Sequence, residues 1–158
     1  MTFLRYFGFA EGIISSLYSE DGEQVQISLH ILYFLSSDHI IGAEIIGAGG
    51  MKSIKEMLFL NDEISRVEAL GVFMNLSLLK EAREEITRKD LVVFLIMLEE
   101  ATLKGSIRSV FLIWRIFQNI SVDTGVCTQL VNNGVIRLLT MSLNLFNSLK
   151  IERIVLEC

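Results

Sequence analysis

A pattern that recurs about every 40 residues constrains this sequence more than any other feature. The tripeptide Asn75-Leu76-Ser77 returns 44 residues later as Asn119-Ile120-Ser121. Apolar residues before the first copy have the i, i+3, i+4, i+7 spacing of one helix face, and they are Ala69, Val72, Phe73 and Leu76. Repeats of this length are typical of helical arrays, in which each unit buries its apolar face against the next.

The same stripe occurs in two further places. The copy that lies 44 residues later consists of Ile113, Ile116, Phe117 and Ile120. The copy that lies 41 residues earlier consists of Ser28, Ile31, Leu32 and Leu35, and Ser36 follows it as Ser77 and Ser121 follow the others. The sequence therefore predicts three equivalent helices.

A second set of helices repeats beside the first. It opens at Gly50, Asp90 and Gly134, with a weaker first copy at Gly12. Met57, Met97 and Met141 each lie seven residues after the residue that opens their helix. We expect their flexible side chains to fill space in the core. Short helices are expected at 38–48, 80–89 and 123–133. The predicted fold is all-α, with a short helix and two longer ones in each unit.

The string from Gly49 to Leu58, followed by a polar loop and Glu68 to Ser77, resembles an armadillo repeat. Val131 to Leu139 resembles the entry of another. The resemblance covers nearly the whole chain as one array with units at about 1–36, 37–77, 78–121 and an incomplete 122–158. It implies an α-solenoid, wound as a right-handed superhelix, and HEAT repeats are the nearest alternative.

In armadillo proteins the third helices line a concave surface, and an Asn near each helix end commonly pairs with the backbone of an extended partner peptide. Asn75 and Asn119 match that Asn, and Phe34 takes its place in the first unit. An amide offers both a donor and an acceptor to a peptide unit. The alternative is that each Asn satisfies local carbonyl groups at its helix end. The other residues expected on this face are His30, Glu68, Arg108 and Arg115.

Nuclear-transport importins carry a Trp four residues before this Asn to hold basic side chains. Here Trp114 lies five residues before Asn119, and Gly71 stands four residues before Asn75. A basic nuclear-localisation ligand is therefore disfavoured, and we expect Trp114 to be buried between units.

No residue pattern indicates an enzyme, a metal site or a cofactor. His30 and His39 have no acidic neighbour at ligand spacing, and the glycines at 47–50 lack the Lys-Ser/Thr of a phosphate-binding loop. A net charge of −5 without long runs argues against nucleic acid.

The high hydrophobic content of 51% does not indicate a membrane protein. The longest apolar run, Leu91 to Leu98, is much shorter than the ~20 residues of a membrane span. Two cysteines make no disulfide framework, so an intracellular location is expected, cytoplasmic with the nucleus left open.

The predicted function is non-enzymatic: a scaffold that binds a protein or extended peptide through the third-helix groove. The alternative is an assembly element, or a piece of a longer solenoid, whose ends make the contacts. Neither end has the polar outer face of a terminal repeat. The first residues include Phe3, Tyr6 and Phe7, and the last include Ile151, Ile154 and Val155. We therefore expect the ends to favour self-association.

Overall fold

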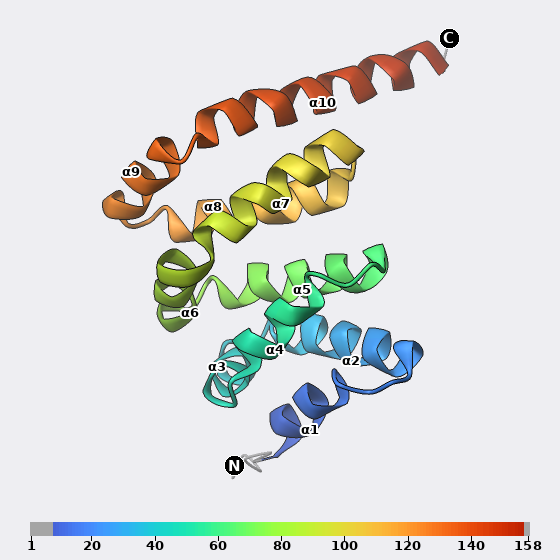
Figure 1. Ribbon diagram of the computed structural model, residues 1–158, viewed down its shortest axis with the longest axis vertical. Coiled ribbons are helices and arrows are strands. Elements are labelled where there is room, and N and C mark those ends of the chain that lie inside the picture. The colour runs from blue at the N-terminus through green and yellow to red at the C-terminus, as the bar shows by residue number, and fades with distance from the viewer. Residues whose placement is uncertain (1–7, 157–158) are drawn as a thin grey trace. The chain divides into compact units, whose positions relative to one another are not determined.

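The computed structural model describes the backbone of residues 8–156 and the side chains of residues 8–148 (Figure 1). Within this range every regular element is a helix, which confirms the all-α prediction. The chain divides into two compact units between Glu84 and Glu85, and each is described by itself below. The predicted apolar ends, Phe3 to Phe7 and the side chains of Ile151 to Leu156, lie outside the described residues.

The first unit is built around two parallel neighbours of the same length, α2 (Gly22–Leu35) and α5 (Glu63–Leu76). Two short helices, α1 (Phe9–Ser16) and α4 (Gly50–Met57), pack against α2 and α5 respectively. α3 (His39–Gly47) connects α2 to α4. The core residues of this unit that are at most 1% exposed include Leu29, Leu32, Ile54, Leu70 and Phe73.

Hydrogen bonds at both ends show that α2 and α5 run in the same direction. Gln26, near the start of α2, donates to Asp62 at the start of α5 (2.9 Å). Near their ends, Asn75 of α5 donates to the carbonyl oxygen of Tyr33 in α2 (3.0 Å). The two helices are therefore parallel neighbours, in register along their whole length.

The second unit follows the short helix α6 (Lys80–Glu85), which spans the division, and one π-helical turn, η1 (Ile86–Asp90). It contains α7 (Leu91–Lys104), α8 (Ile107–Ile120), α9 (Thr124–Asn132) and α10 (Val135–Leu156). α7 packs against both α8 and α10. Its core residues that are at most 2% exposed include Phe94, Leu98, Ile113, Ile116 and Phe117.

The three equivalent helices predicted from the repeated stripe are α2, α5 and α8. Each has 14 residues, and they begin at Gly22, Glu63 and Ile107, with the predicted spacings of 41 and 44 residues. The stripes of α5 and α8 are buried throughout. In α2, Leu32 is buried but Ile31 is 37% exposed, so the first copy of the stripe is covered only in part.

Aspartate side chains cap the starts of four helices, α2, α3, α5 and α9. Asp21 and Asp62 accept hydrogen bonds from backbone N–H groups in the first turns of α2 and α5. Asp38 and Asp123 do the same for α3 and α9. Each cap satisfies a helix N–H that has no partner inside the helix and contributes about 1 kcal/mol.

The predicted openers of the second helices need two corrections. α1 begins at Phe9 after Gly8, whose φ of 104° is left-handed, so Gly12 lies inside the helix and does not open it. α4 is entered through Gly49, whose φ is 78°. Only glycine adopts such angles without strain, and this places the glycine before the helix.

The predicted methionine column is wrong by one residue in its first copy. Counted from Gly49, Met57 occupies the position that Leu98 and Ser142 hold in the later copies, and all three are buried. Met97 and Met141 are equivalent to each other and are half-buried. The core column therefore contains one methionine, a leucine and a serine.

The last helix also differs from expectation. A fourth unit built like the others would end its second helix and begin a separate third helix within 122–158. Instead, α10 continues for 22 residues without a break, whereas its counterparts α4 and α7 have 8 and 14 residues (Figure 1). No glycine, proline or aspartate interrupts the sequence between Val135 and Leu156, so nothing local ends the helix.

We expect Gly50→Ala to lower the free energy of unfolding by about 1–3 kcal/mol. A Cβ at this position would lie 2.7 Å from the backbone oxygen of Ile45, which cannot move without distorting α3. Gly12→Ala is the matched control, since its Cβ would meet nothing within 4 Å, and it should stabilise α1 by about 0.5–1 kcal/mol. Urea unfolding followed by circular dichroism measures both; equal effects would contradict the packing described.

Candidate functional site

Four of the predicted site residues lie on α2 and α5 in the first unit. His30 and Phe34 belong to α2, and Glu68 and Asn75 belong to α5. His30 Nδ1 lies 3.4 Å from Glu68 Oε1, so the structure brings these two side chains together. We call the surface formed by these four residues the α2–α5 surface.

Asn75 uses its donor group within the protein. Its Nδ2 donates to the carbonyl oxygen of Tyr33 and to Ser36 Oγ, both at 3.0 Å. These bonds join the end of α5 to the end of α2. The amide therefore has only its oxygen to offer a partner, whereas the sequence analysis considered both a donor and an acceptor.

Glu68 has an incompletely satisfied carboxylate. Its side chain is only 11% exposed, and Oε1 faces the largely exposed imidazole of His30. Oε2 is buried and has no hydrogen-bond partner among the described residues. A buried carboxylate oxygen without a donor is unfavourable, so this atom has unused capacity to accept a hydrogen bond.

Gly71 lies between Glu68 and Asn75 and allows α2 and α5 to approach closely. A Cβ on Gly71 would lie 2.7 Å from Cδ2 and Cε2 of the Tyr33 ring. The missing side chain is therefore a packing requirement. The sequence analysis noted Gly71 only as the residue that stands where importins carry a Trp, and it did not predict this packing role.

Phe34 completes the α2–α5 surface as an exposed apolar group. Its side chain is 76% exposed, and it follows Tyr33, whose carbonyl oxygen binds Asn75. An exposed aromatic ring beside polar groups with unused acceptors is typical of a contact surface.

The remaining predicted site residues lie on α8 in the second unit. Arg108 and Arg115 are exposed, and Arg115 Nη1 donates to Gln118 Oε1 at 2.7 Å. Asn119 is half-buried and already has an interaction partner in the structure. Trp114 is half-buried and packs edge-on against Phe117 with 5.7 Å between ring centres.

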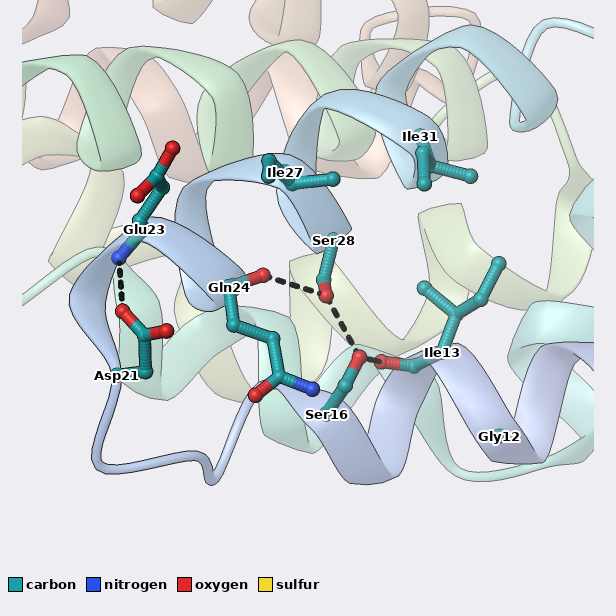
Figure 2. A pocket seen from close by; sticks show the side chains of 9 residues that line it. All are labelled: Gly12, Ile13, Ser16, Asp21, Glu23, Gln24, Ile27, Ser28 and Ile31. Carbon is teal, nitrogen blue, oxygen red and sulfur yellow. Dashed lines mark hydrogen bonds between the residues drawn. The ribbon is translucent and has the colours of Figure 1, made fainter.

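A pocket between α1 and α2 was not predicted (Figure 2). Ile13 of α1 and Ile27 and Ile31 of α2 line it, and Ser16 and Ser28 are hydrogen bonded to each other between the two helices (2.6 Å). The isoleucines on α2 are 52% and 37% exposed. One sequence feature indicated this pocket: the first copy of the repeated stripe has the polar residue Ser28 at the position that Ala69 holds in the second copy.

The pKa of the Asp62 carboxyl lies well below its ordinary value. The Ser65 hydroxyl and backbone N–H, then Gln26 and the backbone of Ile64, donate to its carboxylate and lower its pKa to about 2. Because Gln26 belongs to α2, this carboxylate caps α5 and also ties it to α2. The signal in the sequence was an Asp three residues before a Ser at a helix start.

The described residues contain no group of three His, Cys, Asp or Glu side chains able to hold a metal ion. Across the same part of the chain, no helix combines the length and apolar character needed to cross a membrane.

No known protein family matches the sequence, and a comparison with curated proteins gives no match. Among solved structures, the fold is similar to an engineered protein whose crystal structure came from a structural genomics consortium. The TM-score is 0.70 and the sequence identity is 21%, over 82% of this chain and 53% of the engineered one. The chain thus spans about half the length of that protein, and the similarity concerns the fold alone.

We expect Asn75→Ala to destabilise the first unit by about 1–3 kcal/mol, because it leaves the Tyr33 carbonyl and Ser36 hydroxyl without their shared donor. Asn132→Ala, an exposed asparagine at the end of α9, is the control and should change stability by less than about 0.5 kcal/mol. Chemical unfolding compares the two. A neutral Asn75→Ala would show that the hydrogen bonds to α2 contribute nothing.

The lowered pKa of Asp62 predicts a pH dependence of stability. As the pH falls, this carboxylate takes up its proton at a higher pH in the unfolded chain than in the folded one. Its contribution to the free energy of unfolding is therefore present above about pH 4 and is lost as the pH falls towards 2. Asp62→Asn should therefore be less stable than the wild type at pH 6, and the difference should shrink towards pH 2. Unfolding curves across this range test it, and a difference independent of pH would contradict the assignment.

Proposed function

We propose that the chain is an armadillo-type α-solenoid that binds an extended peptide or protein segment through its third helices and has no enzymatic activity. The α2–α5 surface carries this proposal, because it combines the exposed side chains of Phe34 and His30 with the Asn75 amide, whose N–H groups bond within the protein and whose oxygen is left as an acceptor. Such an acceptor suits an N–H group of an extended backbone or a donor side chain.

The repeated helices support the same proposal. Three 14-residue helices follow one another at spacings of 41 and 44 residues, as stacked repeats require. Their equivalent positions differ in chemistry: Phe34 and Asn75 in the first unit correspond to Asn119 in the second. Sequence-selective binding would follow from such differences, as in other repeat proteins.

Assembly through other faces remains the second candidate. Exposed apolar side chains outside the α2–α5 surface favour it, among them Ile27 and Ile31 on α2 and Phe111 on α8. A cytoplasmic or nuclear location accords with either role and is part of the proposal.

Phe34 and His30 give the sharpest test of peptide binding, since Asn75 also holds the fold together. Peptides selected from a random linear library displayed on phage should bind Phe34→Ala or His30→Ala at least about tenfold more weakly than the wild type, a loss of about 1.4 kcal/mol. Both side chains are exposed, so neither variant should unfold.

Asn132→Ala serves again as the control and should bind selected peptides unchanged. Failure to select any peptide would overturn the proposal, and so would an equal loss of binding in the Asn132→Ala variant.

A further inference from the structure

One side of α8 is exposed although its counterpart on α2 is covered. Ile107, Phe111, Trp114 and Gln118 follow one another at helical spacing, and we call them the α8 stripe. Ile107 is 41% and Phe111 56% exposed. The stripe lies 85 residues after Gly22, Gln26, Leu29 and Tyr33 of α2.

In the first unit, this side of α2 is covered by α5. Gln26 donates to Asp62, Tyr33 packs against Gly71 and accepts from Asn75, and Leu29 is completely buried. The internal repeat therefore shows what kind of element fits the α8 stripe: a parallel helix in the register of α5.

Trp114 provides a second observation on this stripe. Its Nε1 is buried and has no hydrogen-bond partner among the described residues. A buried indole N–H normally has an acceptor. The stripe thus contains exposed apolar surface at Ile107 and Phe111 and, beneath it, a buried N–H group without an acceptor.

The chain also carries a helix edge equivalent to the side of α5 that contacts α2. On α5 this side includes Glu68 and Asn75, and the residues 41 positions earlier are Ile27 and Phe34 of α2. Ile27 also lines the pocket of Figure 2, together with Ile13 of α1 and Ile31 of α2. We call the surface formed by these three isoleucines the α1–α2 edge.

The two surfaces have opposite charge. From Phe9 to Leu35 the chain has four carboxylates, Glu11, Glu20, Asp21 and Glu23, and no Lys or Arg. α8 has Arg108 and Arg115 and no carboxylate. Opposite charges on two apolar surfaces favour contact between those surfaces over contact of either with itself.

We propose that the occupant of the α8 stripe is the α1–α2 edge of a second copy of this chain. Ile27 and Ile31 of one copy would then cover Phe111 and Trp114 of the other, in the register that α5 adopts on α2. The contact is head-to-tail, so each copy keeps one unused surface and association continues beyond a dimer.

Sedimentation velocity of the 158-residue chain between about 1 and about 200 µM tests this, the range in which weak protein contacts dissociate. The average mass should rise with concentration and pass that of a dimer. Ile27→Glu and Phe111→Glu should each abolish the rise. An equimolar mixture of the two variants should form a dimer and stop there, because one retains the α8 stripe and the other the α1–α2 edge.

Matched controls are Ile40→Glu and Phe59→Glu, which replace similar side chains that are 67% and 65% exposed elsewhere. Both should associate like the wild type, and circular dichroism should show all four variants folded. A wild-type chain that stays monomeric at the highest concentration would overturn the proposal, as would controls that also fail to associate or variants that do not pair when mixed.

Trp114 reports on the contact directly because it is the only tryptophan in the chain. Its quenching by acrylamide should fall by at least about twofold as the wild type associates, and it should stay constant in Phe111→Glu. Association that leaves the quenching of the wild type unchanged would place the contact elsewhere.

Discussion

The contact between the parallel helices α2 and α5 is the interaction on which the first unit depends. Apolar side chains such as Leu29, Leu32 and Phe73 supply its stabilisation, since each contributes about 1.5–3 kcal/mol when buried. Polar groups fix its register: Asp62 binds Gln26 at one end, and Asn75 binds Tyr33 and Ser36 at the other. Gly71 permits the close approach between them.

This contact and the proposed binding of a partner would use some of the same side chains. The donor of Asn75 and one oxygen of Glu68 already serve contacts between α2 and α5. The Asn75 amide oxygen and the exposed side chains of His30 and Phe34 remain for the proposed partner. The same geometry, transferred to equivalent positions, shows why the α8 stripe fits a helix of this kind.

The repeated stripe predicted α2, α5 and α8 well because burial on one helix face imposes a strict spacing on apolar residues. Boundaries set by backbone conformation were harder to predict. The sequence offers glycines at 8, 12, 49 and 50, and only the left-handed angles of Gly8 and Gly49 show which of them begin a helix. A one-residue error there moved Met57 out of its true equivalence with Leu98 and Ser142.

The sequence by itself determined the all-α class, the spacing of the third helices and the aspartates that cap α2, α3, α5 and α9, because these follow from periodicity and local hydrogen bonding. Only the tertiary structure decided which polar side chains remain available. Asn75 and Phe34 hold equivalent positions in the repeat, yet one bonds to the neighbouring helix and the other is 76% exposed. That difference depends on whether another helix lies alongside, which a local pattern of residues does not encode.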